Sequence, residues 1–129
     1  MTRTSRPAAL ALAAATAFAA SSTASADVTL INAFEVEPDR LEAAVAAWRD
    51  ARDFLAAEPG YRSTALYRAL APDARFALVN VATWESAEAF GRAAERMRAA
   101  GVFPPLEGVA MTPSLYAPIE SDADPDDAR

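Results

Sequence analysis

The chain has 129 residues, with 18 acidic residues against 12 basic ones, no cysteine and no histidine. This length suits one domain. The lack of cysteine excludes a disulfide framework and a thiolate metal site. The net charge of −6 argues against nucleic acid and anionic membranes as partners.

Residues 1–26 have the three-part pattern of a secretory signal peptide. Arg3 and Arg6 precede an apolar, Ala-rich run from Pro7 to Ala20, and small residues follow up to Ala26. The run is shorter than the roughly 20 residues that a membrane-spanning helix needs. We therefore expect cleavage near Ala26, an exported (secreted or periplasmic) protein, and no membrane partner in the mature form. Removing this segment leaves ten basic residues against 18 acidic ones, a net charge of −8.

The last ten residues, 120–129, contain no apolar side chain larger than Ala. A segment this acidic and this poor in apolar groups is expected to be a disordered tail. The folded domain is therefore predicted at residues 27–119.

The folded part begins with a predicted strand at residues 28–36, VTLINAFEV, which places Asn32 and Phe34 on one face. Residues 39–42 match a capping box, with Asp39 as the predicted cap of a helix that ends at Pro59-Gly60. The apolar face of this helix is predicted to pack on the sheet, and Trp48 is interpreted as core. That face is formed by Leu41, Ala44, Val45, Trp48, Arg52 and Leu55.

A predicted hairpin follows, made of residues 61–70, a turn at 71–74 and a strand from Arg75 to Trp84. The alternation of its first strand would put Tyr61, Ser63, Ala65, Tyr67 and Ala69 on one side, and it does not indicate which side faces a ligand. The second strand is apolar on both faces, so it is predicted to be central. One of its faces carries Phe76, Leu78, Asn80, Ala82 and Trp84.

Ser86 is predicted to cap a second helix that presents Phe90 on its apolar side and ends at Gly101. An irregular loop at 102–108 and a last strand at 109–119, interrupted near Pro113, complete the chain. The order β-α-β-β-α-β predicts an α+β, ferredoxin-like fold, with a four-stranded antiparallel sheet and two helices on one face. The other face of the central strand is also apolar, which predicts a homodimer whose sheets close into a barrel-like core.

Several stretches together resemble the antibiotic biosynthesis monooxygenase domains of the dimeric α+β barrel superfamily. They are INAFEV, the helix with Trp48, EPGYRSTALYRAL and FALVNVATWESAEAF. The resemblance implies a cavity between the sheet and the helices. It also implies oxidation of a small aromatic, polyketide- or quinone-type substrate by O₂ with no cofactor, whether flavin, metal or haem.

Within this resemblance, Asn80 and Trp84 match the Asn and Trp of the cofactor-free members, at the same four-residue spacing. Amide and indole N–H groups in a dry cavity could stabilise a substrate carbanion, so these two residues are the candidate catalytic pair. Asn32 is expected to line the same pocket if the first strand pairs in register. The aromatic and aliphatic wall is predicted to bind the substrate through Phe34, Phe76, Leu78 and Phe90, around a cavity of about 300 Å³ or more.

Other interpretations of the same residues stay open. Asn32 and Asn80 could satisfy each other or a helix end, and Trp84 could simply fill the barrel mouth. The polyketide-oxidising members of this family resemble one another in having a Tyr at the position of Phe90. The Arg that they use has no clear counterpart in this chain. Asn32 and Trp84 also resemble residues of the haem-degrading branch, but that branch ligates iron through His and this chain has none. A non-catalytic exported protein that binds a small hydrophobic ligand is the alternative function.

Overall fold

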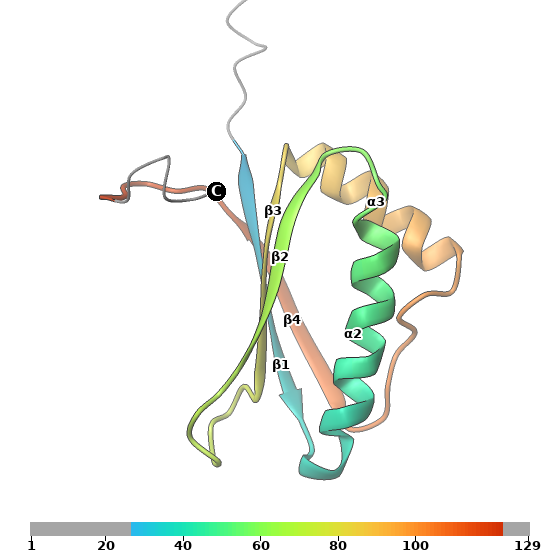
Figure 1. The fold of residues 1–129 in the computed structure, drawn as a ribbon, viewed down its shortest axis with the longest axis vertical. Helices are drawn as coiled ribbons and strands as arrows, with labels where there is room; N and C mark the ends of the chain where they lie inside the picture. Colours follow the sequence, from blue (N-terminus) through green and yellow to red (C-terminus); the bar gives the residue numbers. More distant parts are fainter. Residues whose placement is uncertain (1–26, 123–129) are drawn as a thin grey trace, which may run out of the picture.

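The computed structural model of the protein describes residues 27–122 (Figure 1). The signal peptide predicted at residues 1–26 and most of the acidic tail predicted at 120–129 lie outside the described residues. No helix within 27–122 has both the length and the apolar character needed to cross a bilayer. In chain order the elements are β1 (Val28–Val36), η1 (Pro38–Arg40), α2 (Leu41–Leu55), β2 (Tyr61–Arg68), β3 (Leu78–Trp84), α3 (Ala87–Ala99) and β4 (Val109–Tyr116).

The four strands form one antiparallel sheet in the order β2-β3-β1-β4. Both helices lie on the same face of this sheet, and no helix covers the opposite face (Figure 1). The predicted α+β, ferredoxin-like fold is therefore confirmed. In the pairing of the two central strands, Asn32 lies opposite Asn80 and Val28 lies opposite Trp84. Partners across an antiparallel pair point to the same face, so both Asn side chains lie on the helix side.

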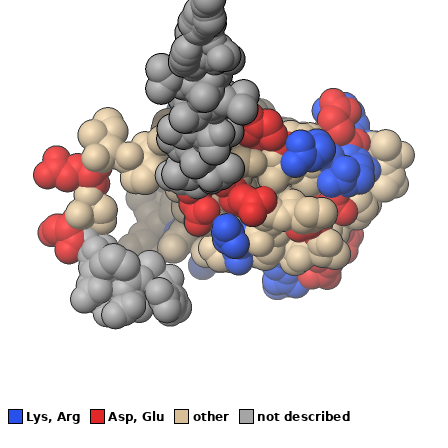
Figure 2. Space-filling model, turned by 90° about the horizontal axis from the view of Figure 1, so that it is seen from above, with Lys and Arg blue, Asp and Glu red and all other residues tan. Residues whose placement is uncertain are grey.

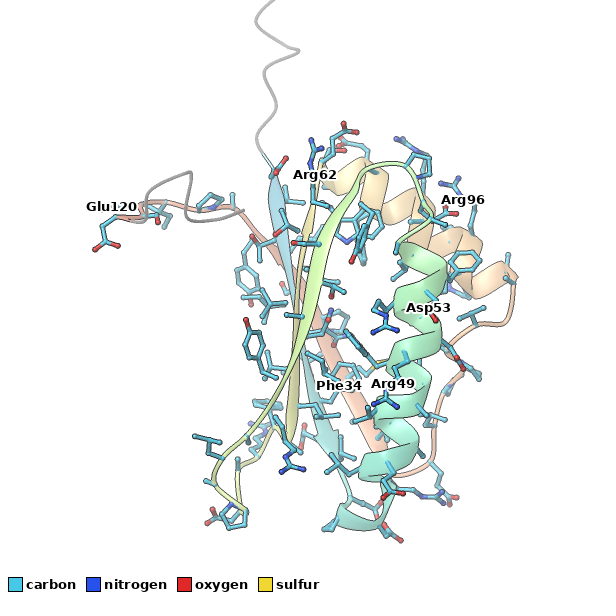
Figure 3. The ribbon with its side chains drawn as sticks, viewed as in Figure 1. Phe34, Arg49, Asp53, Arg62, Arg96 and Glu120 are labelled. Atoms are coloured by element: carbon cyan, nitrogen blue, oxygen red, sulfur yellow. The ribbon has the colours of Figure 1, made fainter. Side chains whose placement is uncertain are left out.

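The core lies between the sheet and the helices, in two clusters. One surrounds Trp84, which is fully buried against Leu30, Ala82 and two alanines of α3. The other joins Phe34 and Leu78 to Ala44 of α2, and Figure 3 shows Phe34 in the layer between the sheet and this helix. Alanines on the helix side let each helix approach the large side chains of the sheet closely. The apolar residues that the sequence pattern identifies thus form two packed clusters, one against each helix.

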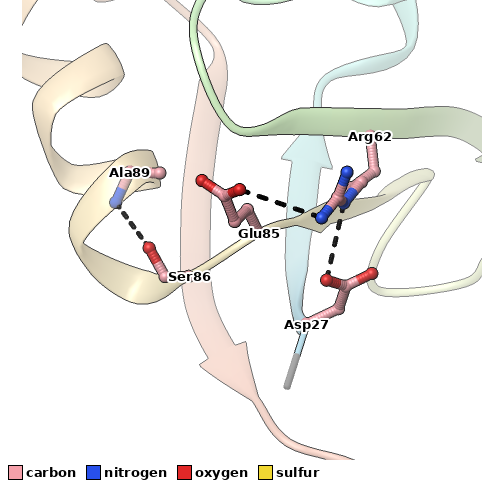
Figure 4. Close-up of polar contacts among 5 residues, drawn as sticks. All are labelled: Asp27, Arg62, Glu85, Ser86 and Ala89. Carbon is pink, nitrogen blue, oxygen red and sulfur yellow. Dashed lines mark hydrogen bonds and ion pairs between the residues drawn. The ribbon is translucent and has the colours of Figure 1, made fainter. Parts of the chain in front are cut away.

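The starts of the two helices differ from each other. Ser86 caps α3 as predicted, because its Oγ accepts a hydrogen bond of 3.1 Å from the backbone N–H of Ala89 (Figure 4). The capping box predicted at Asp39 is wrong. Residues 38–40 form a 3-10 turn, and no side chain caps α2. Pro38 is pre-organised for that turn since its φ is fixed, and the turn feeds directly into the helix.

A β-bulge in β2 corrects the predicted face of Tyr61. The register shifts between Tyr61, opposite Trp84, and Ser63, opposite Thr83. The extra residue places Tyr61 on the helix side, while Ser63 is on the open side. Arg62, at the bulge, is half-exposed and pairs with Asp27 at 3.5 Å and with Glu85 at 3.9 Å (Figure 4).

The last two strands have different bounds from those predicted. β3 begins at Leu78 rather than at residue 75, so Phe76 lies in the connection and not in the sheet. β4 continues through Pro113 to Tyr116 instead of breaking there. β4 pairs only with β1 and is therefore an edge strand. An edge strand tolerates proline where the backbone N–H that proline lacks would have had no partner.

Acidic and basic side chains are interspersed on the end of the molecule seen in Figure 2. Ion pairs join neighbouring elements, and Arg96 of α3 pairs with Glu58 just after α2. The other ion pairs of the described residues are exposed, and exposed pairs contribute little to stability, with typical values of about 0–1 kcal/mol. The fold therefore depends on its two apolar clusters more than on its surface charges.

Two glycines provide a matched test of this packing. Gly60 has a φ of +93°, and a Cβ on it would lie 2.5 Å from the Cβ of Ala89, whereas a Cβ on Gly91 within α3 would meet nothing within 4 Å. Gly91→Ala should stabilise the protein by about 0.5–1 kcal/mol because alanine is the better helix former. Gly60→Ala should destabilise it by about 1–3 kcal/mol through strain and a clash with α3. Urea unfolding of both variants measures this, and equal effects would contradict the described path of the chain at residue 60.

Candidate functional site

A cavity of about 60 Å³ lies between the sheet and the two helices. Its sheet side includes Asn32 and Phe34 from β1, and Asn80 and Trp84 from β3. These are four of the seven site residues predicted from sequence, so the β1–β3 register brings the predicted polar groups together. Their function stays a prediction.

The other three predicted site residues do not line this cavity. Leu78 is 1% exposed and packs with Phe34 and Ala44 beside it. Phe90 packs edge-on against Trp84, with ring centroids 5.5 Å apart. Phe76 lies before β3, where the guanidinium of Arg75 sits over its ring. Alternation along the chain identified the correct face for Leu78, but it could not tell a residue on the cavity from one packed next to it.

The predicted size of the cavity is wrong for this conformation. We expected about 300 Å³ or more, the lower end for a site that holds a drug-sized molecule. The interior volume is about 60 Å³ because side chains from the helix side fill the space. The side chains that close the cavity opposite the sheet include Trp48, Arg52, Met97 and Phe103.

Asn80 is 8% exposed, and its amide oxygen is fully engaged. Nε1 of Trp48 donates a hydrogen bond of 2.8 Å to Oδ1 of Asn80, and Oγ1 of Thr64 donates one of 2.7 Å to the same atom. The oxygen is therefore satisfied by a helix and by a neighbouring strand, not by Asn32. Both bonds fix the orientation of the amide, which leaves its NH₂ group as the part that could serve a ligand.

Two other polar atoms on the cavity have no hydrogen-bond partner among residues 27–122. They are Nε1 of Trp84 and Oδ1 of Asn32, and both atoms are buried. The amide nitrogen of Asn32 has only a weak contact of 3.8 Å to the sulfur of Met111. An unsatisfied buried donor or acceptor costs about 1–3 kcal/mol, so a pair of them on one cavity calls for an explanation. One donor and one acceptor are thus available to a bound molecule.

The structure adds four site residues that the sequence did not identify as such. Thr64 and Trp48 hold Asn80, and Tyr61 reaches the cavity because of the bulge. Arg52 is the one charged residue on the cavity lining, and its guanidinium carbon lies 5.2 Å from the centre of the Trp48 ring. Its signal was present in the sequence as an arginine on the sheet-facing stripe of the first helix, four residues after Trp48.

The site has no group of metal ligands. Within the described part of the chain, His, Cys, Asp and Glu nowhere gather in sets of three or more that could hold a metal ion. The cavity instead offers neutral N–H and C=O groups, aromatic rings and one guanidinium. Groups of this kind can bind and stabilise an anion or a polarised carbonyl.

The antibiotic biosynthesis monooxygenase family matches residues 27–98, from the residue before β1 to the last turn of α3. The chain belongs to this family. A candidate monooxygenase from Shewanella loihica PV-4 is 45% identical to it, over 74% of this chain and 97% of that one, with a TM-score of 0.69. Among curated proteins, none matches the chain.

A second solved structure is similar in fold. It is SnoaB, a cofactor-independent oxygenase from Streptomyces nogalater, which is 22% identical and superposes with a TM-score of 0.58. The match covers 77% of this chain and 99% of SnoaB. At this identity the likeness concerns the fold alone.

The hydrogen bond from Thr64 can be tested without changing the shape of the core. Thr64→Val replaces the hydroxyl by a methyl group and removes one of the two donors to Asn80. We expect a loss of about 0.5–1.5 kcal/mol of unfolding free energy. Asp50→Asn, an isosteric change at an exposed position of α2, is the control and should change the stability by less than about 0.5 kcal/mol. Thermal and urea unfolding measure both, and equal losses would mean that the Thr64 bond contributes nothing specific.

Proposed function

We propose that this protein is a cofactor-independent monooxygenase that oxidises a small aromatic, polyketide- or quinone-type molecule with O₂ in the cavity between sheet and helices. Membership of the family supports a monooxygenase-type function. The observation that carries the proposal is the pair of unsatisfied polar atoms, Nε1 of Trp84 and Oδ1 of Asn32, on one buried cavity. A substrate with both a carbonyl and a hydroxyl group would satisfy both atoms.

The chemistry requires little from the protein beyond stabilising an anion. A hydroxyanthrone-type substrate has an acidic CH₂ group next to aromatic rings. It loses a proton to give a carbanion whose charge is spread onto the carbonyl oxygen. The carbanion passes an electron to O₂, and the two radicals combine into a peroxide. The peroxide anion takes up a proton from solvent. Loss of water, which carries this proton and the remaining hydrogen of the former CH₂ group, then leaves a ketone, so that one oxygen atom enters the product and the other leaves as water.

The residues have distinct roles in this scheme. The N–H of Trp84 donates to the carbonyl oxygen as negative charge builds up there, and the NH₂ of Asn80 is the second donor. Oδ1 of Asn32 accepts a hydrogen bond from a substrate hydroxyl, which orients the ring system. The guanidinium of Arg52 is ion-paired with Asp53 at 3.1 Å, so it offers only a partly neutralised positive charge to an anion in the cavity. No carboxylate or histidine lines the cavity, so the proton leaves to water.

A non-catalytic binding function is the second candidate, and the absence of a general base from the cavity lining favours it. The same donor and acceptor would then hold a hydroxylated aromatic ligand without turnover. Oxygen consumption with a panel of anthrones separates the two functions. Saturable binding with no oxygen uptake on any member of the panel would establish the second function and remove the first.

The role of the unpaired indole N–H of Trp84 is tested with Trp84→Phe, which keeps an aromatic ring and removes the N–H. We expect the rate of oxygen uptake with 1,8-dihydroxyanthrone to fall by about tenfold to a thousandfold, the range for losing one anion-stabilising donor. Val45→Ala, in the other core cluster and not on the cavity lining, is the stability control and should keep its activity. If both variants lose activity in proportion to their loss of melting temperature, Trp84 has only a structural role.

We further propose that two copies of the chain pair through the open face of the sheet. Val79 and Val81 of β3 are only half-buried there, and Tyr67 and Tyr116 are 58% and 51% exposed. A central strand with apolar side chains on both faces needs a cover on each. The helices cover one face, and a second sheet packed face to face would cover the other.

Sedimentation equilibrium tests the dimer. The native protein should be a dimer at micromolar concentration, and Val81→Arg should make it monomeric because the new charge would be buried in the interface. Leu70→Arg introduces the same charge at a fully exposed position in the β2–β3 connection and should leave the dimer intact. A native protein that is monomeric and folded at this concentration would contradict the proposal.

A further inference from the structure

A second pocket, of about 430 Å³, lies beneath the connection between α3 and β4. Its walls are apolar apart from Arg98, and they include Val102, Pro104, Leu106 and Met111. Arg98 is occupied by an ion pair with Glu95 at 2.7 Å. This outer pocket has the volume expected of a small-molecule site, but within residues 27–122 no buried polar side-chain atom without a hydrogen-bond partner lies on its walls.

Phe103 is the one residue that lines both the outer pocket and the inner cavity. Its ring stacks on Phe34, with centroids 6.1 Å apart and an interplanar angle of 28°. Met111 makes a second link, since it lines the outer pocket and its sulfur contacts the amide of Asn32 in the inner cavity. The two spaces are therefore neighbours, and Phe103 contributes to the walls of both.

The backbone of Phe103 is strained. Its φ is +59°, and it is the one non-glycine residue with positive φ among those described. Bulky residues rarely adopt this conformation. The next residue is Pro104, which disfavours helical conformations of the residue before it and favours extended ones. A shift of Phe103 to an extended conformation would relieve the strain, and it would change the direction in which the side chain leaves the backbone.

We propose that the inner cavity and the outer pocket are two parts of one ligand site, and that Phe103 is the movable partition that determines the size of the substrate. This inference rests on the proposed function. The inner cavity holds the unsatisfied donor and acceptor but lacks volume, whereas the outer pocket has volume but lacks polar groups. A flat ligand of several fused rings would place its carbonyl and hydroxyl groups at Trp84 and Asn32 and its remaining rings under the α3–β4 connection.

The apolar character of the outer pocket fits this class of ligand. A multi-ring compound would replace the stacking of Phe103 on Phe34 with its own ring. A single-ring compound with the same hydroxyl and carbonyl groups would need only the inner cavity and the space that the ring of Phe103 leaves when it moves, and it would not extend under the α3–β4 connection. The size of the ligand therefore distinguishes the two parts of the site.

The test compares two probes under anaerobic conditions, where no turnover occurs. They are 1,8-dihydroxyanthrone, with three rings, and 2-hydroxyacetophenone, with one. Binding is followed by quenching of tryptophan fluorescence, because both tryptophans of the chain line the inner cavity. Val102→Phe fills the outer pocket, and Leu70→Phe adds the same ring at an exposed position as a control.

We expect Val102→Phe to weaken the binding of the three-ring probe by about tenfold or more, and to leave the Kd of the one-ring probe within about twofold. Phe103→Ala should raise the association rate of the three-ring probe about tenfold, because no partition has to move. Phe103→Gly should do the same, and it accepts a positive φ without strain, so it covers the case in which the alanine variant does not fold.

Unchanged binding of the three-ring probe to Val102→Phe would show that the outer pocket is not part of the site. Unchanged association rates for both Phe103 variants would show that Phe103 is not a partition. Either result overturns this inference and leaves the proposed function standing. If the native protein binds neither probe, the proposed function fails and this inference fails with it.

Discussion

The pairing of β1 with β3 is the constraint on which the rest of the structure depends. It places Asn32 beside Asn80 on the helix side of the two central strands. Amides are poorly suited to the buried face of a strand, so each one needs a partner or a function. Asn80 obtains partners for its oxygen from α2 and β2. Asn32 and the indole of Trp84 keep a buried acceptor and a buried donor unsatisfied, and this gives the site its polarity.

The polar groups of the cavity fall into two sets: hydrogen-bonded groups that stabilise the fold, and unpaired groups that we propose to act on a ligand. Trp48, Thr64 and the oxygen of Asn80 form a closed network that fixes the amide and ties α2 to the sheet. Such a network is rigid because each member has its partner. Trp84 and Asn32 line the same cavity as this network. A donor held in place before the ligand arrives needs no reorganisation when charge develops, which is the main source of electrostatic catalysis.

The space around these groups is small, and its small volume has a local cause. Phe103 fills the boundary between a small polar cavity and a larger apolar pocket, and it does so with a strained backbone next to Pro104. Strain of this kind persists where the surroundings enforce it, and it is common at sites that change on binding. The small volume of the inner cavity therefore describes one state of a site that a ligand can enlarge.

The sequence by itself determined the order of the elements, the face of the central strands that meets the helices, and the cap at Ser86. It also determined the positions of Asn32, Asn80 and Trp84. These features follow from local patterns of period 2 and 3.6. Tertiary structure decided what lies around them. The bulge that turns Tyr61 inward depends on pairing with another strand. The hydrogen bonds that hold Asn80 and the position of Phe103 on the cavity bring together residues that are far apart in the chain. No periodicity encodes such contacts. Cavity volume likewise depends on how side chains from separate elements fill a shared space, which only the folded chain defines.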